Sequence, residues 1–121
     1  MNAYAAAPNT YQQSAVLTAT PERLVVMLYD GMHRFLFQAA AAMRERDIPA
    51  VHNKLRSAEA ILAHLQSTLD LEQGEIAQNL LSIYLFCRRH LNEARVGLDA
   101  TKVEEVDRLL STLRDAWAQI C

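Results

Sequence analysis

The sequence predicts an all-α protein, an antiparallel four-helix up-down bundle. Apolar residues recur at alternating steps of three and four along four separate stretches, which is the pattern of helices packed side by side. Glycine and proline number only three each, so regular structure can run without interruption. The turns between the stretches are short, and short turns place consecutive helices antiparallel. The 121 residues suffice for one hydrophobic core.

The first predicted helix runs from about Pro21 to Arg46. Thr20 suits the N-cap, Pro21 suits the first helical position, and Glu22 favours the positive end of the helix dipole. No side chain before Glu22 is charged. We therefore expect residues 1–19 to form a flexible N-terminal arm or a short extra helix, outside a bundle of residues 20–121.

Three further helices follow along the chain. The second is expected from about Pro49 to Leu69, and the third from about Glu75 to Val96, just before Gly97, a common C-terminal stop. Thr101 and Glu104 have the spacing of a capping box, which predicts the start of the fourth helix. No strand-like alternation is visible.

The first and third helices have apolar surface on too many sides for a simple bundle. Residues 24–29 are six apolar or aromatic residues in a row, and within residues 80–87 only Ser82 is strongly polar. Six consecutive residues encircle a helix, so some of these side chains face away from the bundle centre. Either the N-terminal arm or a homodimer interface covers them, or they form a groove for a partner's amphipathic helix. Both interpretations stay open.

Composition argues against several classes of function. The net charge is −2, and the 12 basic and 14 acidic residues interleave, so a nucleic acid is not an expected partner. No apolar run approaches the roughly 18 residues that span a bilayer, so membrane insertion is not expected. The N-terminus lacks the features of a signal peptide, and Cys87 and Cys121 do not form a metal-type pair. A cytoplasmic location is expected.

The motifs of catalysis are missing from the sequence. A di-iron bundle uses Glu-x-x-His pairs, and neither these nor His-Glu-x-x-His nor a phosphate-binding glycine loop occurs. We expect no enzyme activity, no cofactor and no metal. One alternative is a histidine phosphotransfer bundle centred on His52, although Lys54 comes one position early and the bulky Arg56 stands where a small residue is needed. A self-associating helical structural protein is a second alternative.

Several segments resemble the flagellar secretion chaperone family (FliS). The longest is Thr18-Ala19-Thr20-Pro21-Glu22-Arg23-Leu24, continuing through residues 27–31 and 34–36. Shorter matching segments follow in the same order along the rest of the chain, at residues 69–70, 74–77, 79–80, 105–106 and 113–117, together with Leu110. The similarity therefore covers essentially the whole chain.

The resemblance implies a bundle that binds the disordered C-terminal segment of flagellin in the cytoplasm. Binding would prevent premature filament assembly and keep flagellin competent for the flagellar type III secretion apparatus. A component of the export gate is implied as a second partner, and a homodimer of the free protein is left open. Ordering a disordered segment costs free energy, so the contact surface should be large for its affinity.

The expected partner-binding residues come from three groups, and for each apolar one an ordinary core position is the alternative. The aromatic residues among them suit a groove edge, because they combine an apolar body with a polar tip. The arm contributes Tyr11, Gln12 and Val16; outward apolar positions of the first and third helices contribute Leu24, Leu28, Tyr29, Tyr84 and Leu91; Arg34 and Asn79 are the polar candidates.

Overall fold

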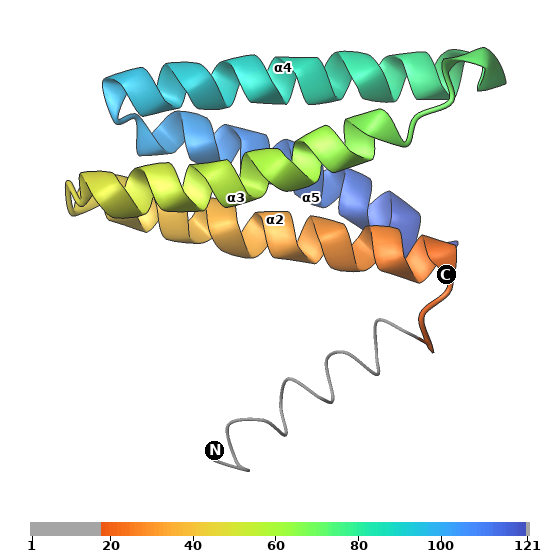
Figure 1. Ribbon diagram of the computed structural model, residues 1–121, viewed down its shortest axis with the longest axis horizontal. Coiled ribbons are helices and arrows are strands. Elements are labelled where there is room, and N and C mark those ends of the chain that lie inside the picture. The colour runs from red at the N-terminus through yellow and green to blue at the C-terminus, as the bar shows by residue number, and fades with distance from the viewer. Residues whose placement is uncertain (1–17, 121) are drawn as a thin grey trace, which may run out of the picture.

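The computed structural model describes residues 18–120, and within them the chain is all-helical. The four α-helices of these residues are α2 (Pro21–Arg44), α3 (Ile48–Ser67), α4 (Glu75–Gly97) and α5 (Ala100–Ala118), and a 3₁₀ turn, η1 (Leu71–Gln73), precedes α4. Consecutive helices run antiparallel (Figure 1). The predicted all-α four-helix bundle is confirmed, whereas the predicted arm lies largely outside the described residues.

The start of α2 follows the sequence prediction. The Thr20 side chain accepts a hydrogen bond from the Arg23 backbone N–H at 3.2 Å, and Pro21 stands at the first helical position. At α3 the Asp47 carboxylate accepts from the Ala50 N–H at 3.3 Å. Side-chain caps of this kind satisfy backbone donors that have no partner inside the helix, and so fix where each helix begins.

The predicted capping box at Thr101 and Glu104 is wrong. The cap of α5 is Asp99, whose carboxylate accepts from the backbone N–H groups of Thr101 and Lys102 at 3.0 and 3.4 Å. Aspartate caps at least as well as threonine, so the earlier position prevails. Glu104 instead accepts a hydrogen bond from Arg44 of α2 at 2.7 Å.

Two helices end where a residue takes the left-handed conformation. Arg46, with φ 56°, follows the end of α2, and Leu98, with φ 50°, caps α4. Gly97 itself is the last helical residue of α4, so the glycine marks the end of the helix but does not make the turn. The chain then turns directly from α4 into α5 through Leu98 and Asp99.

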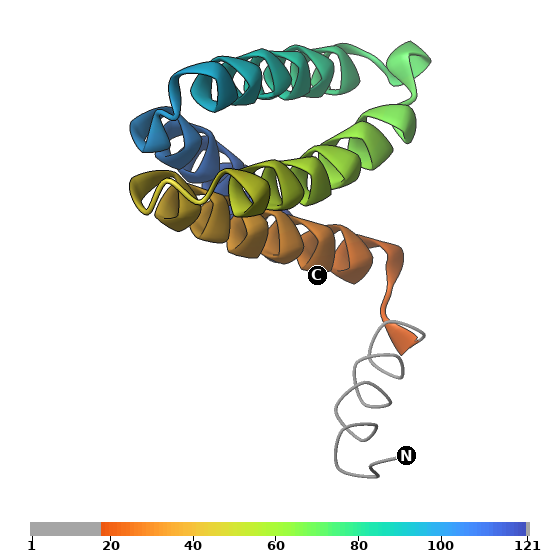
Figure 2. The same ribbon diagram turned by 60° about the vertical axis from the view of Figure 1, so that its left-hand side comes forward.

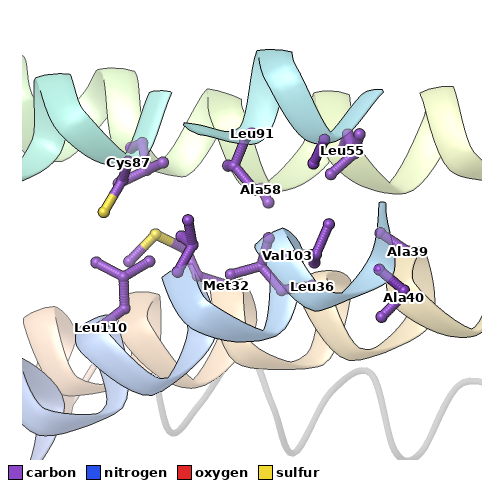
Figure 3. Packing of buried hydrophobic residues seen from close by; sticks show 14 of the residues in the cluster. Met32, Leu36, Ala39, Ala40, Leu55, Ala58, Cys87, Leu91, Val103 and Leu110 are labelled. Carbon is purple, nitrogen blue, oxygen red and sulfur yellow. The ribbon is translucent and has the colours of Figure 1, made fainter. Parts of the chain in front are cut away.

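The core lies where apolar stripes of all four helices meet (Figure 3). Side chains from α2 and α5 point toward those of α3 and α4, and small residues such as Ala39, Ala58 and Ala94 let the helices approach closely. Each large side chain that is fully buried contributes about 1.5–3 kcal/mol. The buried residues described are all apolar apart from the hydroxyl and thiol groups of Tyr29, Tyr84 and Cys87.

The four helices are not packed equally. α2 lies close along both α3 and α5, whereas α4 has fewer contacts with either neighbour. Figure 2 shows α4 next to α5 at the end where the chain passes from one helix to the other, and α5 running away from α4 toward the opposite end. We call the end where α4 begins (Glu75–Tyr84) the open end, and the end where α4 meets α5 (Ala94–Val103) the closed end. No helix in residues 18–120 is long and apolar enough to cross a membrane.

Candidate functional site

Two apolar grooves lie at the open end, one on each side of α4. The α3/α4 groove has a volume of about 370 Å³ and is lined by Val25, Leu65, Thr68, Leu69, Asp70, Gln73, Ile76, Ala77, Leu80, Tyr84 and Trp117. The α4/α5 groove has a volume of about 260 Å³ and is lined by Ile76, Leu80, Leu113, Ala116, Trp117 and Ile120. Ile76, Leu80 and Trp117 belong to both. The first turns of α4 thus separate two hollows that share Trp117.

The connector between α3 and α4 forms one edge of the α3/α4 groove, which Asp70 and Gln73 line. After α3 ends, Asp70 caps the 3₁₀ turn η1 by accepting from the Glu72 backbone N–H at 3.1 Å. Gly74 then takes φ 107° and ψ −159°, a conformation that residues with a Cβ rarely adopt. This turn and glycine set the direction in which the chain enters α4, beside the α3/α4 groove.

Charged side chains fasten α4 at the closed end. Arg95 pairs with Glu59 of α3, and Lys102 of α5 pairs with Glu93 at 3.1 Å. The His90 Nε2 atom lies 2.6 Å from the Glu105 carboxylate of α5. By contrast, no ion pair in residues 18–120 joins residues 75–84 of α4 to another helix. The grooves therefore lie beside the half of α4 that is held mainly by apolar packing.

Tyr29 of α2 and Tyr84 of α4 share a hydrogen bond across the bundle, with 2.6 Å between their oxygen atoms. Both residues are 2% exposed. Burial raises the pKa of the Tyr29 hydroxyl, and the hydrogen bond with Tyr84 raises it further, whereas a hydrogen bond with Trp117 lowers it. Burial likewise raises the pKa of Tyr84. Both hydroxyls are therefore neutral at physiological pH.

The structure corrects the outward orientation predicted for three residues. Tyr29, Tyr84 and Leu91 are buried in the core, Leu91 completely. The aromatic argument failed because the two hydroxyls satisfy each other inside the protein and need no water. Tyr84 still lines the α3/α4 groove, as part of its wall.

The other predicted site residues have different surroundings. Leu24 and Leu28 are half-buried on α2, and Arg34 and Asn79 are exposed. Of these four, none lines either groove. The Arg34 guanidinium lies over the ring of Phe35, 5.8 Å from its centroid. Tyr11, Gln12 and Val16 lie outside the described residues. His52, the centre of the phosphotransfer alternative, is exposed on α3.

The prediction of surplus apolar surface on the third helix is confirmed. Among the large apolar residues of residues 18–120 that are exposed, four lie on α4: Ile76, Leu85, Phe86 and Val96. Ile76 fits the three-four apolar spacing of this helix, which predicts an inward position, but the residue is 77% exposed. The inward positions of α4 at its start are Ala77 and Tyr84. Sequence reasoning therefore missed Ile76, Leu80 and Trp117 as groove residues.

Comparison with known proteins gives one consistent result. The family model of the flagellar protein FliS matches residues 3–121. The flagellar secretion chaperone FliS of Salmonella typhimurium is 39% identical over 110 residues, which cover 89% of this chain and 82% of the relative. That of Bacillus subtilis is 34% identical over 109 residues, covering 90% and 81%. That of Campylobacter jejuni is 31% identical over 113 residues, covering 93% and 88%.

The fold and the grooves define a class of protein, a small helical bundle that presents apolar surface between its helices. The comparisons identify the family within that class. The chain belongs to the FliS family of flagellar secretion chaperones. The resemblance seen in its sequence segments is thereby confirmed.

Proposed function

We propose that the chain binds the C-terminal segment of flagellin at the open end of the bundle, in the cytoplasm, and delivers it to the flagellar export apparatus. The observation that carries this proposal is the pair of apolar grooves that meet at Trp117. Its relatives bear the name flagellar secretion chaperone, which supports a flagellar export client as the occupant.

The sizes of the grooves fit side chains better than a whole helix. About 370 and 260 Å³ are enough for a few apolar side chains each. A client helix would therefore lie over the grooves and insert its apolar face on either side of Ile76. This residue is 77% exposed in the free protein, so a client can remove much of its apolar surface from water.

A client bound in this way stays suited to export. Its apolar face is covered, so it cannot pair with other flagellin molecules, and its helices have no tertiary core of their own to unfold. Release would come from transfer to a component of the export gate, the second partner that we propose. Leu24, Leu28, Arg34 and Asn79 remain proposed contacts outside the grooves, and Tyr11, Gln12 and Val16 remain predictions on the N-terminal segment.

Two variants of α4 test the proposal. Ile76→Ser removes an apolar side chain from both grooves, and Val96→Ser removes an equally exposed one, 82% exposed, that lines neither. Burying such a side chain is worth about 1.5–3 kcal/mol, so Ile76→Ser should weaken binding of the flagellin C-terminal segment roughly 10- to 100-fold. Val96→Ser should bind like the wild type. Isothermal titration calorimetry measures both, with a negative heat-capacity change expected.

The result that would contradict the proposal is equal binding by the wild type and Ile76→Ser. Because both residues are exposed, both variants should fold, and circular dichroism checks this. Mass measurement in dilute solution tests the competing idea that a second copy of the chain covers the grooves. A constitutive dimer that does not dissociate when the flagellin segment is added would also contradict the proposal.

A further inference from the structure

The open end carries carboxylates that have no basic partner. Glu22 lies in the first turn of α2, Asp70 and Glu72 lie in the connector, and Glu75 starts α4. Among residues 18–120, none of these four forms an ion pair. We call them the acidic rim, because Asp70 lines the α3/α4 groove and the others lie within one helical turn of the lining residues Val25, Gln73 and Ile76.

Little positive charge on this chain compensates for the rim. Arg23 is the one basic residue in the first turn of α2, and it lies beside Glu22. Arg114 of α5 is already engaged, since it donates to Asp30 at 2.9 Å and to Asp115 at 3.4 Å. The closed end differs, because there Arg44, Arg95 and Lys102 each face a carboxylate. Within residues 18–120, Arg88 of α4 forms no ion pair and donates to the Gln66 amide of α3 at 2.8 Å. Because the four rim carboxylates outnumber Arg23 and Arg88, the open end is apolar in its grooves and negative on balance around them.

The chain's own candidates for covering the grooves do not match this charge. Residues 1–21 contain no lysine or arginine, so no side chain of the N-terminal segment can neutralise the rim. A second copy docked open end to open end would bring two acidic rims together, which is unfavourable. A partner with positive charge beside its apolar face matches both features of the surface.

We propose that the open end selects helices that carry lysine or arginine beside their apolar face, so that the client's basic residues meet the acidic rim while its apolar residues enter the two grooves. This inference rests on the proposed function and adds the chemistry of the client. The grooves would supply most of the affinity, and the rim would supply the choice between clients and a faster association.

The test uses two synthetic amphipathic peptides of equal length and identical apolar face. One carries lysines beside that face, and the other carries glutamates at the same positions. Trp117 reports binding, because it is the only tryptophan of the chain and lines both grooves. At low salt the lysine peptide should bind about tenfold tighter or more, and the ratio should approach one near 1 M salt, where the Debye length is about 3 Å.

A pair of double variants locates the effect. Glu72→Gln with Glu75→Gln neutralises half of the acidic rim, and should reduce the preference for the lysine peptide about threefold or more at low salt. Glu45→Gln with Glu105→Gln removes the same charge from exposed positions away from the open end, and should leave the preference unchanged. The glutamine oxygen at position 105 can still accept a hydrogen bond from His90, so the contact between α4 and α5 is kept.

The outcomes separate this inference from the proposed function. If both peptides bind equally at low salt, or if the two double variants behave alike, the charge selection is overturned while the apolar grooves keep their role. If neither peptide changes Trp117 fluorescence and the flagellin segment binds without sensitivity to Ile76→Ser, the open end is not the binding site and both proposals fail.

Discussion

The hydroxyl groups of Tyr29 and Tyr84 lie inside an otherwise apolar core, and they belong to helices that are diagonal in the bundle. A buried hydroxyl without a partner is costly, so each tyrosine restricts where the other helix can be. Because Tyr84 also lines the α3/α4 groove, this hydrogen bond sets the position of α4 beside the site. The pair thus links the core to the groove.

Phenylalanine substitutions should show this coupling. Tyr84→Phe leaves the Tyr29 hydroxyl without its Tyr84 partner, and should lower the free energy of unfolding by about 1–3 kcal/mol. The double variant Tyr29→Phe with Tyr84→Phe removes both hydroxyls, so its loss should be smaller than the sum of the two single losses. Urea denaturation of the four proteins measures the cycle. Strict additivity would show that the two hydroxyls do not interact.

The same pair gives the stability a pH dependence. Because the folded protein holds the pKa of both hydroxyls above the unfolded value of about 10, the unfolded chain loses these protons first. The free energy of unfolding should be constant with respect to these groups below about pH 10 and should fall as the pH rises further. The double phenylalanine variant should lose this part of the alkaline slope.

At the scale of single residues, the sequence predicted the surplus of apolar surface but not which side chains form it. Tyr29 and Tyr84 looked suited to a groove edge, and only their mutual hydrogen bond explains their burial. Ile76 fits the three-four apolar spacing of its helix, yet it is exposed, because the inward positions at the start of α4 are Ala77 and Tyr84. Both errors concern distances between helices, which depend on the whole packing and not on local pattern.

Among the elements, α4 and the connector before it set the geometry of the site. The first residues of α2 and α3, Pro21 and Ile48, could be predicted to within about one residue, because capping residues act locally. A turn at residues 70–74 was predicted between the second and third helices, but not its 3₁₀ form, although Asp70 caps it, since the short stretch has no periodic pattern. The direction in which Gly74 sends the chain could not be predicted either. The α3/α4 groove therefore depends on the connector at residues 70–74, the part of the bundle whose conformation the sequence predicts least well.

Two glycine substitutions test the role of the connector. Gly74→Ala forces a side chain into φ 107°, and should lower the free energy of unfolding by about 1–3 kcal/mol or shift the start of α4. Gly97 is helical, and a Cβ added there would meet no atom within 4 Å, so Gly97→Ala should be neutral or stabilising by up to about 1 kcal/mol. Thermal denaturation compares them.

Client binding gives the second readout for this pair. If the backbone at Gly74 holds the α3/α4 groove open, Gly74→Ala should also weaken binding of the flagellin segment, while Gly97→Ala should not. An alanine at position 74 that changes neither stability nor binding would mean that the connector does not shape the groove.

In the whole molecule, the two ends of the bundle differ: ion pairs hold α4 to its neighbours at the closed end, and apolar surface is accessible at the open end. Charged side chains and the direct turn from α4 into α5 hold the closed end, whereas the open end has two apolar grooves beside an acidic rim. The fold class was predictable from the three-four spacing of apolar residues, which needs no knowledge of contacts. The difference between the closed and the open end was not predictable, because it results from ion pairs such as Arg95 with Glu59 that join distant parts of the sequence.

Hydrogen–deuterium exchange with and without the flagellin C-terminal segment tests the central claim most directly, which is that the client occupies the open end. In the free protein, residues 75–84 should exchange faster than residues 94–103, because fewer interactions hold them. On binding, residues 75–84 and 113–118 should gain protection, while residues 94–103 should change little. Protection confined to the closed end, with residues 75–84 unchanged at saturation, would contradict the account.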